Sequence, residues 1–172
     1  DATNFYIALY DEERDTITFP YLVDTSDSRC GPVSGVTGKD SLTARVLETR
    51  RPLLITGAEI ETQRTASGHS IIKGKIPKSW LGVPLLSCDQ RIGVMTVQSY
   101  DGTAKYDETD ADTMNAVAAQ VAVAILRKQI ASQLQDSLWR FRKILENIAG
   151  IAIQGYDHYR RVTFWNSASE KL

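Results

Sequence analysis

The feature that most constrains this chain is a long stretch with helical spacing. From Asp107 to about Ile148, apolar residues recur every three or four positions, and Asp110 follows Asp107 in the arrangement of a helix-capping box. Roughly forty residues of helix measure about 60 Å, which is longer than a small domain can cover. We therefore expect part of this helix to extend beyond the domain that contains its beginning.

The second half of the predicted helix carries a repeat typical of a coiled coil. Such a seam needs a partner helix, although three heptads are near the minimum for this pattern and a single helix lying across its own domain is the alternative. We predict a homodimer through this helix. The seam residues, at spacings of 4, 4, 4, 3, 4 and 3, are Leu126, Ile130, Leu134, Leu138, Phe141, Leu145 and Ile148.

Strand patterns occupy much of the chain before the helix. Residues 5–9 and 16–23 are rich in strand-forming residues around a charged turn at 11–15, which predicts a β-hairpin. The ranges Trp80–Ser87 and Ile92–Tyr100 predict a second hairpin. After Gly150 the period of two returns around a polar turn, which predicts a further hairpin-like unit.

One helix and one long connection are expected between the first two hairpins. Asp40 or Ser41 can cap a short helix through Arg50, and Pro52–Thr56 has the pattern of a buried strand. Gly57–Lys78 is predicted to be a long polar connection. Connections of this length are often binding loops or lids, so we expect this one to cover a site.

Composition and charge exclude several classes of function. With 20 basic and 21 acidic residues, the chain has no positive excess to attract nucleic acid. The longest uncharged run, Thr113–Leu126, is shorter than the ~20 residues that cross a bilayer, so no membrane insertion is expected. Cys30 and Cys88 are the only cysteines, which does not indicate a secreted disulfide scaffold. We expect a cytoplasmic protein.

No pattern in the sequence indicates catalysis or metal binding. The H-E-x-x-H, G-x-S-x-G and C-x-x-C motifs are absent. His69 and His158 are the only histidines, and they are too far apart in sequence to form a metal-ligand motif. We therefore predict no catalytic residue, no metal site and no enzymatic activity for this chain.

Three blocks resemble the GAF family in order and spacing. They are Ser41–Ile55, the pair Trp80–Leu86 and Ile92–Ser99, and the Asp107–Asp110 cap with its helix through Ala124. The first helix usual in the family has no counterpart here. The resemblance implies an α+β fold, an α/β sandwich with a central antiparallel sheet, helices on one face, the long connection covering the other, and a long C-terminal coiled-coil helix.

The end of the chain resembles the beginning of PAS domains. The relevant segments are Ile144–Ile153 and Phe164–Leu172. The second segment contains the Asn-x-Ala turn that follows the second strand in PAS domains. The predicted organisation is a GAF-like sensory domain at 1–125, a signalling helix at 126–147 and a truncated start of a PAS-like domain at 148–172. This tandem implies a downstream output domain, such as a histidine kinase of a two-component system or a diguanylate cyclase.

The GAF resemblance also implies a ligand pocket beneath the long connection. Our candidates for its wall are Arg64, His69, Trp80 and Tyr100, with ordinary core or rim positions as the alternative for the two aromatic residues. The Asn-Lys pair of cyclic-nucleotide relatives is absent, and neither cysteine has the adjacent histidine usual in bilin attachment. A haem bound through His69 is a further alternative. We expect neither haem, bilin nor a cyclic nucleotide, no cofactor is required, and the small ligand stays unknown.

These patterns predict a sensory and regulatory module that binds a small ligand or partner and relays the signal through a dimeric helix. One alternative is a ligand-free dimerisation scaffold. Another is a methionine sulfoxide reductase of the GAF fold, in which loop cysteines attack the sulfoxide. Cys30 and Cys88 lack the local pattern of that group.

Overall fold

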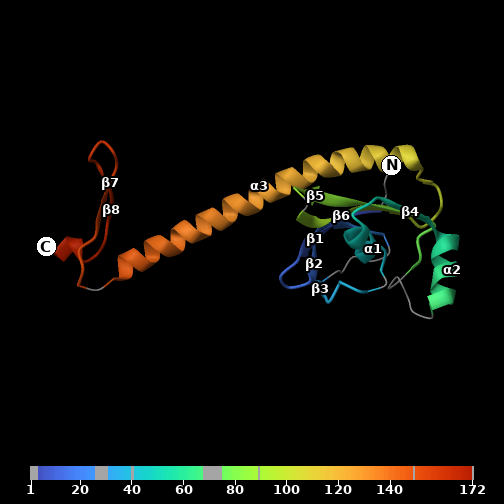
Figure 1. The fold of residues 1–172 in the computed structure, drawn as a ribbon, viewed down its shortest axis with the longest axis horizontal. Helices are drawn as coiled ribbons and strands as arrows, with labels where there is room; N and C mark the ends of the chain where they lie inside the picture. Colours follow the sequence, from blue (N-terminus) through green and yellow to red (C-terminus); the bar gives the residue numbers. More distant parts are fainter. Residues whose placement is uncertain are drawn as a thin grey trace. The chain divides into compact units, whose positions relative to one another are not determined.

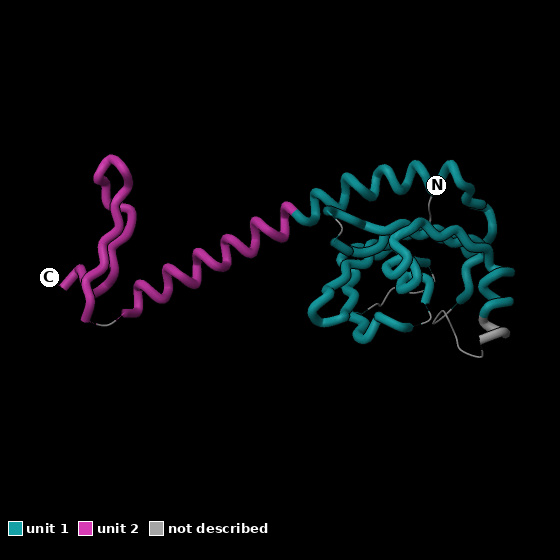
Figure 2. Tube along the Cα trace, viewed as in Figure 1, with its two compact units in different colours: residues 1–126 teal, residues 127–172 magenta. Residues whose placement is uncertain are grey.

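In the computed structural model the chain divides into two compact units, residues 1–126 and 127–172 (Figure 2). The structure describes residues 4–25, 31–39, 41–67, 75–88, 90–148 and 150–171. Within these ranges, residues 64–67 are described by their backbone alone.

Unit 1 contains a six-stranded sheet with the order β3-β2-β1-β6-β5-β4, in which every neighbouring pair is antiparallel (Figure 1). Two of its pairs, β1 with β2 and β5 with β6, are the hairpins predicted from the sequence, and both are confirmed. The strands are β1 (Asn4–Asp11), β2 (Thr16–Val23), β3 (Val33–Ser34), β4 (Leu53–Thr56), β5 (Ser79–Ser87) and β6 (Gln90–Ser99).

The short predicted helix is α1 (Leu42–Thr49). Of the two candidate caps, the structure assigns Ser41, whose hydroxyl oxygen accepts a hydrogen bond from the Ala44 amide at 3.1 Å. The helix ends at Arg50, which adopts a left-handed conformation with φ 55°.

Part of the predicted long connection is helical, and this corrects the expectation of a loop from residue 57 to 78. Helix α2 spans Gly57–Ser67. The Thr56 amide donates to Glu59 Oε2 at 2.8 Å, and the Glu59 amide donates to Thr56 Oγ1 at 3.4 Å. This reciprocal pair is a capping box, and the Thr-x-x-Glu signature is visible in the sequence. Residues 68–74 lie outside the described part of the chain.

The sheet separates two apolar cores, one on each face. Helices α1 and α3 lie on opposite sides of the sheet (Figure 1). On what we call the α1 face, Val46 and Leu47 of α1 join a cluster that includes Trp80. On the opposite α3 face, Ala118 and Ala122 pack in a cluster with strands β5 and β6. The fold class is confirmed, but helices cover both faces rather than one. Strand β5 is buried on both faces, so each needs a cover.

Helix α3 spans Glu108–Asn147, which confirms the long helix. Its start is the predicted capping box: the Asp107 amide donates to Asp110 Oδ2 and the Asp110 amide to Asp107 Oδ1, both at 3.0 Å. Among the described residues, no helix has both the length and the apolar character needed to cross a membrane.

Unit 2 holds the C-terminal part of α3 and a two-stranded antiparallel hairpin, β7 (Gln154–Tyr156) and β8 (Val162–Trp165), followed by the short helix η1 (Ser169–Lys171). The hairpin expected after Gly150 is therefore present. Asn166, fully buried at the end of β8, donates through its side chain to the Ile151 carbonyl at 2.8 Å.

Candidate functional site

A row of polar side chains crosses the α1 face of the sheet. Thr96 and Gln98 of β6 are 0% and 7% exposed, and Asn4 of β1, directly opposite Gln98 in the register, is 3% exposed. On its other side Gln98 pairs with Trp80 of β5. Side chains alternate along a strand, so Thr96 and Gln98 share the face on which Val94 packs with the α1 cluster. Buried polar residues are unusual in an apolar core, which makes this row the first candidate for binding.

The Gln98 side chain belongs to a hydrogen-bonded cluster at the end of the row. Its Nε2 atom donates to Asp24 Oδ2 at 2.5 Å and to the Tyr100 hydroxyl at 2.9 Å, while that hydroxyl donates to the same Asp24 oxygen at 3.1 Å. A carboxylate only accepts hydrogen bonds, so Asp24 fixes which end of the Gln98 amide faces it. Lys75 Nζ lies 5.3 Å from the centre of the Tyr100 ring.

Asn4 ties the chain that follows β2 to the same end of the sheet. Its Oδ1 atom accepts from the Thr25 amide at 2.7 Å and from the Thr25 hydroxyl at 2.8 Å. Its Nδ2 atom donates to the Gln98 carbonyl at 3.3 Å. The carboxylate of Asp24, the residue before Thr25, lies beside Gln98 and Tyr100 in the same cluster.

The Trp80 ring lies over the backbone of Gly82 on its own strand. A Cβ atom on Gly82 would lie 2.2 Å from the Trp80 ring carbon Cη2, so the glycine makes room for the indole. Thr96 pairs with Gly82 across the two strands, and its Oγ1 atom is buried without a hydrogen-bond partner among the described residues. Such atoms usually pair with protein, water or a ligand. The buried Thr96 hydroxyl is therefore a second indication, after the row of buried polar residues, that the α1 face is a candidate binding site.

Asp101 closes the turn just after the cluster. Hydrogen bonds from the Thr103 backbone N–H and hydroxyl, and then from the Ser99 hydroxyl, lower the pKa of Asp101 to about 2. The Lys78 ammonium group donates to the Asp101 carbonyl at 3.2 Å. The turn that carries Tyr100 thus has its own hydrogen-bond framework and a carboxylate that stays charged.

The sequence-predicted site residues are partly brought together. Trp80 lies in β5 and Tyr100 directly follows β6, and both flank Gln98: Trp80 as its register partner and Tyr100 by a hydrogen bond. Trp80 is only 2% exposed. His69 and the side chain of Arg64 lie outside the described part of the chain. Ligand binding by these four residues stays a prediction.

Sequence reasoning missed Asp24, Gln98 and Thr96. A signal for the last two exists, because they alternate with Met95 and Val97 in a strand whose apolar partners indicate burial on both faces. No comparable signal marks Asp24, which follows β2 and reaches the cluster only through the tertiary fold.

The described residues include one of the two cysteines. Cys88 is an exposed free thiol at the β5–β6 turn, with φ 47°, and Cys30 lies outside the described residues. Within the described ranges, no three His, Cys, Asp or Glu side chains form a group suited to a metal ion.

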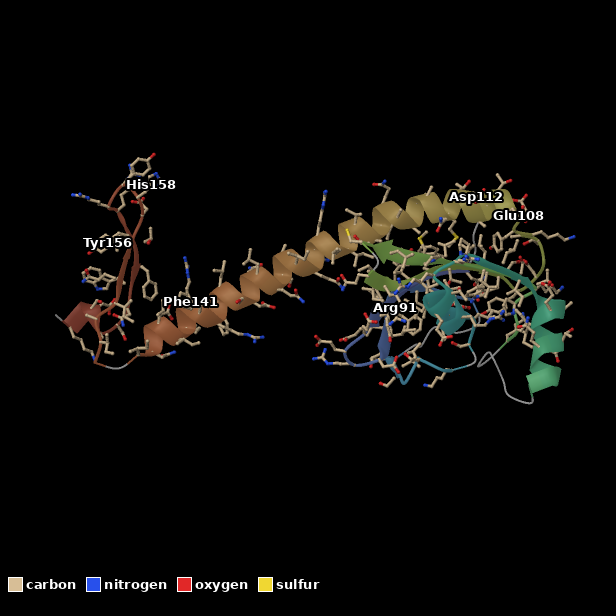
Figure 3. The ribbon with its side chains drawn as sticks, viewed as in Figure 1. Arg91, Glu108, Asp112, Phe141, Tyr156 and His158 are labelled. Carbon is tan, nitrogen blue, oxygen red and sulfur yellow. The ribbon has the colours of Figure 1, made fainter. Side chains whose placement is uncertain are left out.

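The predicted seam residues differ in exposure. Ile130, Leu134, Leu138 and Phe141 are 55%, 60%, 55% and 57% exposed, and Phe141 projects from α3 in Figure 3. Leu126 instead packs against the core on the α3 face of the sheet. Exposed apolar side chains at helical spacing are consistent with the homodimer, which stays a prediction.

A family model described as GAF domain matches residues 1–126. The chain belongs to the GAF domain family. The match covers the sheet, both of its cores and the first half of α3. The GAF resemblance stated from the sequence is thereby confirmed, whereas the PAS-like start stays a prediction. No curated protein matches the chain.

Several solved structures resemble this GAF chain at identities that show the fold alone. One is residues 122 to 287 of a methyl-accepting chemotaxis protein, with TM-score 0.61 and 20% identity over 76% of this chain and 81% of that one. The GAF domain of a two-component sensor histidine kinase from Bacillus halodurans has TM-score 0.56 and 17% identity over 77% and 86%. The reduced form of fRMsr from Staphylococcus aureus has TM-score 0.51 and 18% identity over 69% and 68%.

Proposed function

We propose that this chain is a sensory and regulatory module of a larger signalling protein. The observation that carries the proposal is that one unbroken helix, α3, contains both residues buried against the sheet and a repeat of exposed apolar residues further along. A helix of this kind connects the core of a domain to a surface through which two copies can associate. Similar folds in a chemotaxis protein and a sensor kinase support the same class of function.

The ligand site in this proposal is the polar row on the α1 face. Asp24, Gln98 and Tyr100 supply a carboxylate, an amide and a phenol within one hydrogen-bonded cluster, and Thr96 adds a buried hydroxyl with no hydrogen-bond partner in the described part of the chain. These groups suit a small polar ligand that presents hydrogen-bond donors, with Trp80 as an apolar wall. Arg64 and His69 stay candidates for the cover.

The proposed relay depends on thermodynamic coupling between ligand binding and the pairing of α3 helices from two copies. A ligand that binds one arrangement of the sheet and its cover more tightly shifts the population toward that arrangement. The start of α3 shares a core with the sheet, so the shift alters the pairing of the helices from two copies. The proposed organisation is sensory domain 1–125, signalling helix 126–147 and a PAS-like start at 148–172, followed by a cytoplasmic output domain.

Thermal unfolding with candidate ligands tests the sensory part. Nucleotides, free amino acids and haem are added one class at a time to the full 172-residue chain. A ligand at 100 times its Kd should stabilise the folded protein by about 2.7 kcal/mol. Gln98→Leu and Tyr100→Phe should abolish that shift, whereas the exposed Tyr159→Phe should retain it. An unchanged shift in both cluster variants would remove this site from the proposal.

The competing function is a ligand-free dimerisation scaffold, and one observation favours it. Trp80 covers Gly82 and is almost fully buried, so side chains of the protein already fill part of the α1 face. A scaffold would self-associate through α3 with no response to any of the three ligand classes. A sensor would show both self-association and a ligand-dependent change in it.

We propose no catalytic role for this chain. The reductase alternative requires a pair of reactive thiols. The structure describes only one of the two cysteines, Cys88, which lies at an exposed hairpin turn. An assay for reduction of free methionine sulfoxide with the wild type and with Cys30→Ser, Cys88→Ser decides the matter. Activity in the wild type that the double variant loses would overturn the non-catalytic assignment.

A further inference from the structure

Two neighbouring polar side chains on the α1 face have hydrogen-bonding capacity that the described protein groups do not use. Thr96 is fully buried, and its Oγ1 atom has no hydrogen-bond partner among the described residues. Gln98 follows two residues later on β6, so its side chain leaves the same face of the sheet about 7 Å away. Burying a polar group without a partner is unfavourable, so such groups commonly bind water or a ligand.

The Gln98 side chain is able only to accept a further hydrogen bond. Both hydrogens of its amide nitrogen are already in use, because Nε2 donates to Asp24 Oδ2 at 2.5 Å and to the Tyr100 hydroxyl at 2.9 Å. A carboxylate cannot donate, so Asp24 keeps the amide from turning over. The Oε1 atom lies on the other branch of the planar amide and is left as an acceptor.

Thr96 complements Gln98, because a hydroxyl group can donate a hydrogen bond as well as accept one. Within the ranges that the structure describes, no positively charged side chain donates a hydrogen bond to Asn4, Thr96 or Gln98. The Asp24 carboxylate instead places a negative charge beside Gln98. An anionic ligand in this row would therefore be buried next to a like charge, which is unfavourable.

We propose that the α1 face binds an uncharged lactam or primary amide. The N–H of the ligand donates to Gln98 Oε1, and its carbonyl oxygen accepts from the Thr96 hydroxyl. The inference rests on the proposed function, because it names the class of ligand for the same site. It also separates this ligand from nucleotides, free amino acids and haem, which all carry phosphate or carboxylate groups.

The Trp80 ring is the part of the site that moves when the ligand binds. It lies over Gly82, and Gly82 is the register partner of Thr96. Thr96 is fully buried in this arrangement, so a ligand reaches its hydroxyl by displacing the ring. Gly82 has no side chain, and the ligand gains the space that the ring leaves.

Three related molecules test the ligand class. γ-Butyrolactam is uncharged, its N-methyl derivative lacks the N–H, and pyroglutamate is the same lactam with a carboxylate. Each is titrated into the full 172-residue chain, and its Kd is taken from the shift of the isotopically labelled Thr96 methyl resonance. We expect γ-butyrolactam to bind at least about tenfold more tightly than either control, because the controls leave Gln98 Oε1 unpaired or bury a charge.

Tryptophan fluorescence measures the displacement of the Trp80 ring. Trp139 and Trp165 are 62% and 44% exposed, so Trp139→Phe, Trp165→Phe leaves the buried Trp80 as the sole emitter at little cost to the fold. Its emission should move to longer wavelength with γ-butyrolactam and stay unchanged with the N-methyl derivative. Binding without any change in emission would contradict the displacement of the ring.

Thr96→Val separates a binding role from a structural one. Valine has the shape of threonine without the hydroxyl, so the ligand-free variant should melt at the wild-type temperature or above it. Its Kd for γ-butyrolactam should nevertheless rise at least about tenfold. Thr18→Val, at an exposed position of β2, should leave this Kd unchanged. A lower melting temperature with an unchanged Kd would overturn the role of Thr96 in binding.

Asp24→Asn tests whether Asp24 positions the Gln98 amide. Asparagine can donate a hydrogen bond, so the Gln98 amide becomes able to turn over, and the preference for γ-butyrolactam over its N-methyl derivative should be lost. Asp112→Asn, on α3, should retain the preference. An unchanged preference in Asp24→Asn would overturn the assignment of Gln98 Oε1 as the acceptor.

Equal affinity for the three molecules, or binding of none of them, would overturn the ligand class. If a nucleotide, an amino acid or haem then stabilises the wild type and not Gln98→Leu, the sensory function and its site remain while the ligand class fails. If no ligand of any class stabilises the protein, the ligand class and the sensory function both fail.

Discussion

The side-chain amide of Asn166 donates a hydrogen bond to the backbone carbonyl of Leu145, in the last turns of α3, at 3.3 Å. The same side chain accepts hydrogen bonds from the Ile153 amide at 3.0 Å and from the Ser169 amide at 3.1 Å. One buried asparagine thus connects the end of the helix to both sides of the hairpin in unit 2. A rotation of the helix end would reach the hairpin through these bonds.

Replacing Asn166 by aspartate should release the hairpin from the helix end. The carboxylate has the same shape but cannot donate to the carbonyls of Leu145 and Ile151, so both lose a partner. We expect the local opening free energy to fall by about 1–3 kcal/mol, measured by hydrogen exchange at the Ile153 and Ser169 amides. Asn115→Asp, at an exposed position of α3, should leave these amides unchanged.

Truncating Trp80 should be among the most costly single changes in unit 1. Its ring fills the space above Gly82 in the core of the α1 face, so Trp80→Ala should reduce the free energy of unfolding by about 3–5 kcal/mol in urea titrations. Trp139, which is 62% exposed, provides the matched control, and Trp139→Ala should cost less than about 0.5 kcal/mol. Similar losses in the two variants would show that the Trp80 ring is not a core element.

Gly93 is placed where no side chain fits. A Cβ atom at Gly93 would lie 2.0 Å from the carbonyl oxygen of Ala8 on the neighbouring strand. Gly93→Ala should therefore push β1 and β6 apart and destabilise unit 1 by about 1–3 kcal/mol in the same titrations. Gly31→Ala, where no atom lies within 4 Å of the added carbon, should have little effect.

Asp101 should make the stability of unit 1 fall as the pH becomes acidic. Its folded-state pKa of about 2 is below the ordinary value of 3.8, so its charge stabilises the fold above about pH 4 and this contribution is lost as the pH falls toward 2. Asp101→Asn should lower the urea midpoint at neutral pH and flatten its change between about pH 4 and 2. Asp136→Asn, in an exposed part of α3, should leave that pH dependence as in the wild type.

Periodicity predicted most of the elements because the spacing of apolar residues directly reflects which sides are buried. The α3 helix and its Asp107–Asp110 cap, the hairpins and the Ser41 alternative for α1 all follow from local patterns. Helix α2 was missed because the composition of residues 57–78 is polar, although its Thr56–Glu59 capping signature was present. The polarity of a segment indicates exposure and does not exclude a helix.

The candidate site was less accessible to sequence reasoning because its residues meet only in the tertiary fold. Trp80 and Tyr100 were recognised as aromatic residues near a predicted lid. Asp24 joins them in the tertiary fold, where Asn4 binds Thr25 and the end of β2 lies beside β6. The assignment of Leu126 to the seam stays a prediction for a related reason: spacing alone does not show whether an apolar side chain faces its own sheet or a partner, and Leu126 is partly buried against the core on the α3 face.

The pairing of β1 with β6 determines when this domain can fold on the ribosome. Asn4 and Gln98 are 94 residues apart in sequence and adjacent in the sheet. At about 5–20 residues per second, β1 waits on the order of 5–20 s for its partner strand to be synthesised. During that interval the β1–β2 hairpin exposes Phe5, Ile7 and Leu9, which the completed sheet packs on its α3 face. These side chains stay uncovered until the first half of α3 has also been synthesised, so the nascent chain is most vulnerable to aggregation before Leu126 has emerged.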